Sequence, residues 1–316
     1  MAINWYPGHM HKARKQMLEV LPKIDVIIEI VDARLPHSSE NPVIQEFRDD
    51  KPCLKLLSKS DLADPDITQQ WQSHWQEHRA MPSLAISTKD RAQIKKLPDL
   101  IRKQVSAKIR ETRKIQALIC GIPNVGKSTL INYLSGRNAA KVGNEPAVTK
   151  AQQQIHLSDD IVLNDTPGIL WPKFENANSG YRLAISGAIR DTAIDYEDIA
   201  LYAVQYLAEY YPETLKKRYQ LHDIDRDLDF QGQIALLEAI GRRRGAKGSG
   251  GRVNLHKASE LLIHDYRTAN LGLVSLETPA MIERELEEVA RQQAEKQALK
   301  QQQAEVKAKR RSGKRH

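Results

Sequence analysis

The sequence predicts an α/β fold, in which a P-loop sheet with its helices is followed by a smaller all-α domain. Short apolar runs, one of them nearly all β-branched, end at polar loops, as strands buried in a parallel sheet do. One such run, Ile115 to Cys120, leads into a glycine-rich loop and then a helical segment. From about Trp171 onward, apolar residues recur at helical spacing instead. The 316 residues suit domains at 1–175 and 176–285, with a basic, Gln-rich tail at 286–316.

Composition argues against several classes of protein. No stretch approaches the roughly 20 uncharged apolar residues of a membrane span, and Met1 to Met10 is too polar for a signal peptide. We therefore expect a cytoplasmic protein that makes no membrane contact. The two cysteines, Cys53 and Cys120, lie in apolar runs, so we expect reduced, buried thiols; two are too few for a structural zinc site.

The first predicted strand, Val26 to Val31, is nearly all β-branched, as expected of a strand buried on both faces. It ends at the loop Asp32-Ala33-Arg34-Leu35-Pro36. A helical stretch from about Lys12 to Leu21, ended by Pro22, precedes it.

The second predicted strand, Cys53 to Leu57, leads into Ser58-Lys59-Ser60-Asp61. Guanine-nucleotide proteins carry Asn-Lys-x-Asp at this place, where the Asp accepts hydrogen bonds from guanine N1 and N2 and the Lys stem covers the ring. Asp61 and Lys59 fit these roles. Because Ser58 replaces the Asn, we expect guanine selectivity with looser support. Taken alone, the turn suits a solvated loop equally well.

The third predicted strand, Leu84 to Ile86, ends at Ser87-Thr88-Lys89. Guanine binders place a loop here whose backbone NH meets the base oxygen, and these residue types permit that contact. The next segment, Arg91 to Lys114, carries apolar residues at helical spacing among Lys, Arg and Gln, which predicts one or two amphipathic helices.

The glycine-rich loop runs Gly121-Ile122-Pro123-Asn124-Val125-Gly126-Lys127-Ser128-Thr129. Its spacing is that of a phosphate cradle, in which backbone NH groups surround a β-phosphate, Lys127 reaches the β and γ oxygens, and the Ser128 hydroxyl holds magnesium. The helix that begins behind Lys127 adds its positive dipole end to the same anion. An ordinary glycine turn is the alternative, but strand, loop, Lys and Ser together favour a nucleoside phosphate site.

Two more strands are predicted after the P-loop, at Gln152 to Leu157 and Ile161 to Leu163, and the second delivers Asp165-Thr166-Pro167-Gly168. This motif, following a buried strand and a P-loop, predicts that Asp165 supports magnesium and that the Gly168 amide contacts the γ-phosphate. Thr149, in the loop before these strands, could complete the magnesium shell, although an exposed loop threonine usually has no such role.

These motifs together predict one nucleotide site. Its expected magnesium ligands are Ser128, Thr149 and Asp165. Its expected nucleotide contacts come from the base-reading loops, the P-loop and the end of the Asp-x-x-Gly motif: Ser58, Lys59, Ser60, Asp61, Ser87, Thr88, Asn124, Val125, Gly126, Lys127, Ser128, Thr129 and Gly168.

The order of the motifs identifies a family. Small GTPases usually run from the P-loop through Asp-x-x-Gly to the base-reading loops, whereas here the base-reading loops come first. With Trp5-Tyr6-Pro7-Gly8-His9-Met10, Asp32 to Pro36 and Lys257-Ala258-Ser259-Glu260, the chain resembles the circularly permuted GTPases of the YlqF/YawG family over nearly its whole length. The resemblance implies a P-loop GTPase sheet of six strands in circularly permuted order.

The resemblance also implies an activity, which is GTP hydrolysis coupled to late assembly of the large ribosomal subunit and stimulated by that subunit. Ile169 stands where many GTPases have a water-orienting Gln, and isoleucine cannot polarise water. The family resemblance nominates His9 for this catalytic role beside Lys127. It also suggests that Asn124 helps to bind a potassium ion.

The all-α region is predicted from helical periodicity. Asp195 is a plausible N-cap, and Pro212 ends the helix that follows, whose apolar face is Ile199, Tyr202, Ala203, Tyr206, Leu207 and Tyr210. Apolar helical faces recur at Ile234 to Ile240 and at Leu255 to Tyr266. Residues from about Pro279 to His316 predict a long charged helix that continues into the basic tail.

Two basic segments suggest a polyanionic partner. The net charge is +8, and residues 291–316 hold nine Lys or Arg against two Glu. The basic loop, residues 241–252, has five basic residues, five glycines and no acid. Both suit contact with RNA phosphates, and the resemblance points to rRNA of the large-subunit precursor. A solvated connector and a solubilising tail are the alternatives. We expect a monomer.

A mechanical hypothesis follows from the permutation. GTP would hold Thr149 and Gly168, and because Gly168 runs into the helical region, hydrolysis would change the angle between the two domains and release the subunit. The alternatives are an ATP-using P-loop enzyme, an RNA-binding scaffold that acts outside ribosome assembly, and a membrane-signalling GTPase, the last without a lipidation motif in its favour.

Overall fold

A computed structural model of the chain describes residues 15, 17–48, 50–135, 153–166, 168, 170 and 174–312. The chain forms two compact units, residues 1–277 and residues 278–316. The first unit contains a sheet with its helices and a group of further helices. The second contains the helix α13 (Pro279–Ser312), which confirms the long charged helix predicted there.

The sheet has six strands in the order β3-β2-β1-β4-β6-β5. Every neighbouring pair is parallel except β5 and β6, which are antiparallel. The strands begin and end within about a residue or two of the predicted runs, and the permuted six-stranded order is confirmed. Their bounds are β1 (Val26–Asp32), β2 (Cys53–Ser58), β3 (Ser83–Ala85), β4 (Ile115–Gly121), β5 (Gln153–His156) and β6 (Ile161–Asp165).

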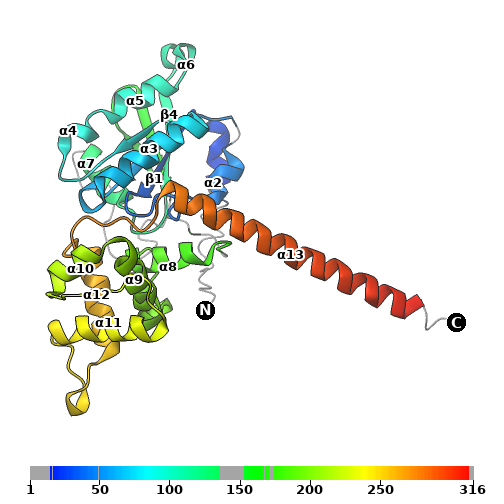
Figure 1. Cartoon of the computed structure of the whole chain (residues 1–316). Coiled ribbons are helices and arrows are strands. Elements are labelled where there is room, and N and C mark those ends of the chain that lie inside the picture. Colours follow the sequence, from blue (N-terminus) through cyan, green and yellow to red (C-terminus); the bar gives the residue numbers. More distant parts are fainter. Residues whose placement is uncertain are drawn as a thin grey trace. The chain divides into compact units, whose positions relative to one another are not determined.

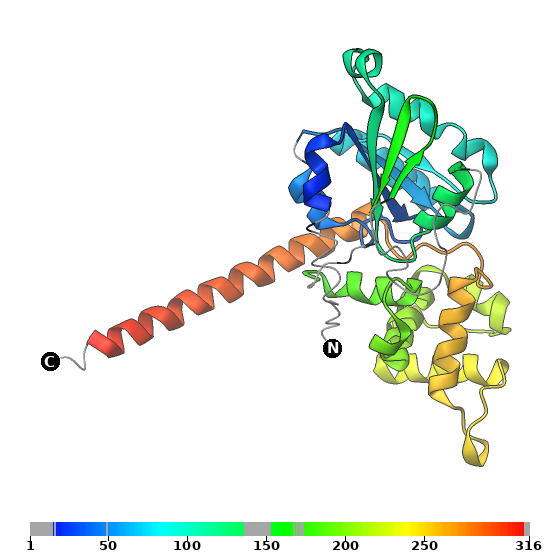
Figure 2. The ribbon, with the colours of Figure 1, turned by 180° about the vertical axis from the view of Figure 1, so that it is seen from behind.

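The central strands are buried because helices cover both faces of the sheet. All residues of β1 and β2 are buried. The helix α3 (Pro65–Arg79) lies on the face turned to the viewer in Figure 1, and α7 (Lys127–Ser135) lies on the face seen in Figure 2. Since β1, β2, β4 and β6 run parallel, their carboxyl ends meet at one edge, where each leads into a predicted motif.

The segment from residue 91 to 114 differs from its prediction. It forms three short helices, α4 (Arg91–Ile94), α5 (Leu97–Gln104) and α6 (Ala107–Thr112), rather than one or two. Pro98 occupies the first turn of α5, where its missing N–H costs nothing but where a continuous helix would lose a hydrogen bond. Extended backbone at Val105 then separates α5 from α6. A further short helix, α2 (Pro42–Phe47), follows β1.

The helical part of the first unit contains α8 (Ala177–Ser186), α9 (Tyr196–Tyr210), α10 (Pro212–Tyr219), α11 (Phe230–Arg243) and α12 (Leu255–Arg267). The predicted N-cap is confirmed, because the Asp195 side chain accepts hydrogen bonds from the N–H groups of Glu197 and Asp198. Gly241 to Arg243, predicted as part of a loop, form the last turn of α11. None of the helices in the described part of the chain combines the length and apolar character that a membrane crossing requires.

Candidate functional site

The P-loop lies between the end of β4 and the start of α7. Gly121 lets β4 approach β1 closely, since a Cβ there would lie 2.7 Å from the Ile30 carbonyl oxygen. Gly126 has a φ of +98°, in the left-handed region that favours glycine. The loop therefore curls tightly before α7 begins at Lys127, as a cradle of backbone N–H groups around a phosphate requires.

Lys127, at the start of α7, and Asp165, at the end of β6, form a buried ion pair. Asp165 is fully buried, and Lys127 is 6% exposed. Among the described residues, Asp165 Oδ2 has no hydrogen-bond partner. Burial raises the pKa of Asp165, and the Lys127 ammonium offsets only part of that rise. A buried carboxylate with an unsatisfied oxygen, close in space to the P-loop lysine, is a suitable ligand for a divalent cation.

Gly168 lies against the P-loop backbone. A Cβ at this residue would come within 3.0 Å of the Pro123 nitrogen and 3.1 Å of the Pro123 Cα. Two residues earlier, Thr166 is bonded to β4, the strand that leads into the P-loop, because its hydroxyl donates to the Ile119 carbonyl oxygen at 3.1 Å. The segment after β6 therefore passes directly beside the phosphate loop.

Ser58 connects the base-reading loop to the P-loop. Its hydroxyl oxygen lies 2.9 Å from the Val31 carbonyl oxygen and 2.6 Å from the Val125 carbonyl oxygen. A serine can therefore support this loop in place of the usual asparagine, through the end of β1 and the P-loop backbone. Val125 itself is buried, whereas Thr129 is exposed on α7.

The two base-reading loops lie side by side. The Ser60 N–H donates to the Ile86 carbonyl oxygen at 3.2 Å, and Lys89 Nζ lies 2.8 Å from Asp61 Oδ2. Burial raises the pKa of Asp61, but hydrogen bonds from Lys89 and Ser87 outweigh it and lower the pKa. Asp61 therefore stays ionised, as an acceptor for guanine N–H groups must. Thr88, the remaining predicted contact of these two loops, is exposed.

Asn124 extends the site toward the helical part. Its side-chain Nδ2 donates to the Gly187 carbonyl oxygen at 2.8 Å. Gly187 caps α8 with a φ of +82°. Arg267 of α12 holds the same helix end by donating to the carbonyl oxygens of Ile185 and Ala184 at 2.9 and 3.0 Å. The P-loop thus contacts the end of a helix that a second helix holds in place.

Two predicted site residues, His9 and Thr149, lie outside the described residues. The structure also brings forward residues to which sequence reasoning assigned no role. Asp32 and Arg34 lie beside Lys59, and Glu277 bonds to the loop after β1. The signal available in the sequence was an acid at the end of a buried strand, Asp32, in the same position relative to β1 as Asp165 is to β6.

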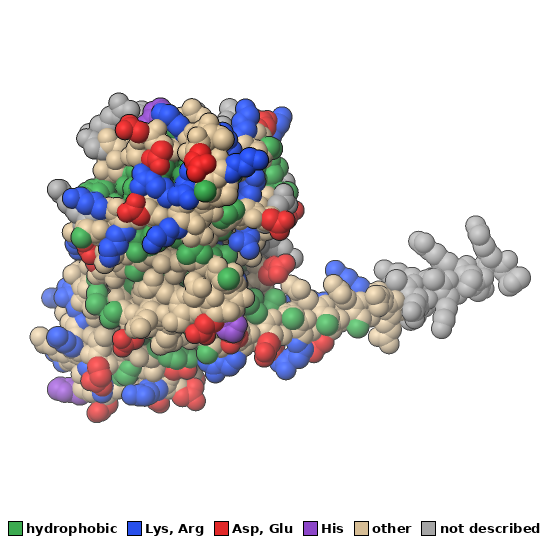
Figure 3. Space-filling model, turned by 90° about the horizontal axis from the view of Figure 1, so that it is seen from above, with side chains coloured by type: hydrophobic (Ala, Val, Ile, Leu, Met, Phe, Trp, Pro, Cys, Tyr) green, Lys and Arg blue, Asp and Glu red, His purple; other side chains and the backbone are tan. Residues whose placement is uncertain are grey.

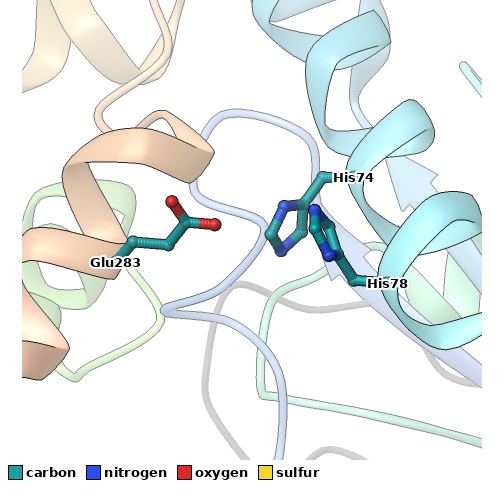
Figure 4. A group of neighbouring side chains, drawn as sticks. All are labelled: His74, His78 and Glu283. Atoms are coloured by element: carbon teal, nitrogen blue, oxygen red, sulfur yellow. The ribbon is translucent and has the colours of Figure 1, made fainter.

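A pair of histidines on α3 is a separate feature. His74 and His78 lie one turn apart with ring centroids at 4.6 Å (Figure 4). His74 also packs edge-on against the buried Trp71 ring at 5.6 Å. Aromatic packing accounts for the position of His74, and neither histidine belongs to the loops described above.

Comparison with known proteins agrees with this geometry. A family model described as "50S ribosome-binding GTPase" matches residues 116–237. The chain is 45% identical over 286 residues to "Ribosome biogenesis GTPase A" of Bacillus pumilus, covering 88% of this chain and 99% of that protein. It is 31% identical to "Probable ribosome biogenesis GTPase A" of Mycoplasma genitalium, covering 87% of this chain and 96% of that protein.

Among solved structures, GNP-bound YlqF from T. maritima matches with a TM-score of 0.59 and 24% identity, covering 85% of this chain and 98% of that chain. This likeness supports the circularly permuted fold. Taken with the identity and coverage of the sequence relatives, it leads to one conclusion: the chain belongs to the ribosome biogenesis GTPase A family.

Proposed function

We propose that this chain binds GTP with magnesium, hydrolyses the GTP, and uses that cycle to bind and then leave the maturing large ribosomal subunit. One observation carries the proposal. The phosphate motif after β4, Asp165 at the end of β6 and the base-reading residues after β2 lie at one edge of one sheet. The name shared by the relatives supports the ribosome-assembly context.

In this proposal, the residues of the P-loop edge have separate roles. Lys127 meets the β and γ oxygens, and the Gly168 amide contacts the γ-phosphate. Ser128, Asp165 and Thr149 hold magnesium, which supplies positive charge to the phosphate that is transferred. The unpartnered Oδ2 of Asp165, judged among the described residues, supports the oxygen ligand set.

Asn124 is the proposed potassium ligand. Its Nδ2 faces the Gly187 carbonyl, and its carboxamide oxygen is the atom that a cation would use. A potassium ion there would supply positive charge beside the phosphates, where other GTPases use an arginine.

His9 is the proposed catalytic group for water. Ile169 cannot accept or donate a hydrogen bond through its side chain, so another residue has to orient the attacking water. We expect His9→Ala to bind GTP normally and to slow subunit-stimulated hydrolysis about 10²- to 10⁴-fold, measured as phosphate release with and without large subunits. An unchanged stimulated rate would remove His9 from the mechanism.

The basic loop is the proposed RNA contact of the first unit, and the tail 291–316 is that of the second. The loop extends away from the other helices at the end of α11 (Figure 1). Arg243, Lys247 and Arg252 are exposed and form no ion pair among the described residues, whereas Arg242 pairs with Glu238. On the face shown in Figure 3, basic side chains lie among acidic ones, so that face has no single sign of charge.

The proposed coupling runs through the chain itself. Gly168 contacts the P-loop backbone, and α8 begins only nine residues later, at Ala177. The nucleotide state would therefore be transmitted to the helical part through a short connection. Hydrolysis would lower the affinity of the protein, which we propose acts as a monomer, for the large subunit.

Sedimentation with purified large subunits tests this function. We expect the chain to co-sediment with subunits in GTP or a non-hydrolysable analogue and to dissociate in GDP. Equal co-sedimentation in all three nucleotides would contradict the proposal. Competition between GTP and ATP for a fluorescent GDP analogue, measured on the same preparation, tests guanine selectivity separately.

A further inference from the structure

One carboxylate at the end of β1 binds two cations. Asp32 is 1% exposed, and Arg34 donates to it from Nε to Oδ1 at 2.9 Å and from Nη2 to Oδ2 at 2.8 Å. Lys59 donates from Nζ to the same Oδ2 at 2.8 Å. This is a fork-to-carboxylate pair with a third group attached, a geometry that leaves the carboxylate little freedom to move.

The strand register explains why Lys59 meets Asp32. Asp32 is paired with Ser58 across β1 and β2, so Lys59 follows directly after the residue opposite Asp32. Lys59 has a φ of +56°, in the left-handed region that most residues other than glycine and asparagine avoid. Such a conformation persists where the surroundings hold it, and the bond to Asp32 is one such restraint.

The charge balance shows that the lysine depends on this acid. Burial raises the pKa of Asp32, but Arg34 and Lys59 outweigh it and lower the pKa, so Asp32 stays ionised. Burial lowers the pKa of Lys59, Arg34 lowers it further, and Asp32 opposes both. Without Asp32, Arg34 and Lys59 would repel each other and would both lose the carboxylate that they bind.

The helical part supports the other cation. The Arg34 guanidinium carbon lies 4.9 Å from the centre of the Tyr266 ring of α12, and the Arg34 carbonyl oxygen accepts from the Leu276 N–H at 2.6 Å. Among the described residues, the Tyr266 hydroxyl has no hydrogen-bond partner. The contact of Tyr266 with Arg34 is therefore made by the face of its ring.

From these contacts we infer that Asp32 is a positioning residue for guanine. It holds Lys59 where the lysine stem covers the base, and Tyr266 stabilises this arrangement from the helical part through Arg34. The inference rests on the proposed function, because it takes a guanine nucleotide as the ligand that Lys59 covers. It assigns the helical part a role in base binding that is separate from contact with the phosphates.

The test compares two ligands of different extent. GDP fills both the base and phosphate sites, whereas inorganic pyrophosphate with magnesium fills the phosphate site alone. For Asp32→Asn we expect GDP affinity to fall about 10- to 100-fold, since a charge-assisted bond to Lys59 is lost. We expect pyrophosphate affinity, measured by competition with a fluorescent GDP analogue, to change by less than about twofold, because the described hydrogen bonds of the Asp32 carboxylate go to Arg34 and Lys59 and not to the P-loop.

Two control variants distinguish an effect on the placement of Lys59 from a general loss of stability. Asp25, just before β1 at its other end, makes an equivalent fork with Arg113 at 2.5 and 2.7 Å, so Asp25→Asn removes a similar pair away from the site. We expect it to leave GDP affinity unchanged. Tyr266→Leu should weaken GDP binding about 5- to 30-fold, and Tyr266→Phe, which keeps the ring, should restore the wild-type value.

The outcomes are distinguishable. If the wild-type chain binds GDP no better than ADP, the proposed function and this inference both fail. If the wild type prefers GDP but Asp32→Asn binds it equally well, or loses pyrophosphate to the same extent, the inference alone fails. Should Asp32→Asn not fold, the Tyr266→Leu and Tyr266→Phe pair decides the question by the same two ligands.

Discussion

At the phosphate site, two opposite charges are buried against each other. Lys127 and Asp165 are nearly or fully excluded from solvent, and each is the charge partner of the other among the described residues. Removing one partner of such a pair leaves the other uncompensated, which costs more than the pair itself contributes.

We therefore predict two effects for Lys127→Ala. Nucleotide binding should be lost, because no other cation reaches the phosphate from this loop, and the free energy of unfolding should fall by about 3–5 kcal/mol. Titration with a fluorescent GDP analogue and urea denaturation measure the two effects. Lys114→Ala, at an exposed lysine just before β4, is the control and should change neither.

Asp265 gives a prediction about pH. It is fully buried and accepts hydrogen bonds from Arg218 at 2.9 and 3.0 Å and from the Tyr219 hydroxyl at 3.1 Å. Burial raises the pKa of Asp265, but bonds from Arg218, Asn270 and Tyr219 outweigh it and lower the pKa. A depressed carboxyl pKa contributes stability above the usual value of about 3.9, and that stability is lost as the pH falls through the folded-state value.

We predict that Asp265→Asn costs about 3 kcal/mol near neutral pH and that its unfolding free energy declines less steeply than that of the wild type below about pH 4. Urea denaturation at a series of pH values measures both slopes. Equal slopes would show that other carboxylates account for the acid sensitivity. Asp223→Asn, at an exposed site, should follow the wild-type curve.

At this scale, sequence reasoning could assign roles where a motif fixes both residue type and spacing. Lys127, Asp165 and Lys59 were predicted in that way, and the described geometry brings the first two together. Asp32 and Glu277 could not be assigned roles, because their contacts depend on strand register and on a separation of 239 residues between Ser38 and Glu277. Neither quantity is visible as a local pattern.

Among the elements, strands were easier to predict than helices. A nearly all β-branched run marked β1, and short apolar runs marked β2 and β4, since a central parallel strand is buried on both faces. The helix α8 was not predicted because its buried face includes Ser179, Gly180 and Arg182, which give no apolar periodicity. Pro212, predicted only to end α9, also begins α10, at whose start a proline is favoured.

The basic loop makes a prediction about salt. A triple variant in which Arg243, Lys247 and Arg252 are all replaced by alanine should lose up to three phosphate contacts. The slope of log affinity against log salt concentration should then become less negative by up to about 2–3. Large-subunit binding at several KCl concentrations measures this slope. The matched control replaces three other exposed lysines with alanine: Lys95 before α5, Lys103 on α5 and Lys108 on α6. It should leave the slope unchanged.

Across the whole first unit, Glu277 joins parts that are distant in sequence. Its carboxylate accepts from the Ser38 N–H at 2.9 Å and lies 3.5 Å from Arg182 Nη1 of α8. Its carbonyl oxygen accepts from Trp71 Nε1 of α3 at 3.1 Å. One buried residue thus bonds to the loop after β1, to a helix on the sheet and to the helical part.

We predict that Glu277→Gln makes the unfolding of the first unit less cooperative. The variant keeps the shape of the side chain but loses its charge, so the Arg182 guanidinium loses its buried counter-charge, and we expect a stability loss of about 3 kcal/mol. Scanning calorimetry should show a broadened or divided transition where the wild type shows one. Glu213→Gln, at an exposed pair with Lys216, should keep the wild-type profile.

The bond from Asn124 to Gly187 has a consequence for natural variation. The acceptor is a main-chain carbonyl, which every amino acid possesses, and the donor is a single side chain in the phosphate loop. Substitutions along α8 can therefore accumulate without erasing this connection, whereas one codon change at Asn124 would erase it. We therefore expect this contact to survive many amino-acid substitutions in α8 but few at Asn124. Deep mutational scanning of both segments would measure this difference.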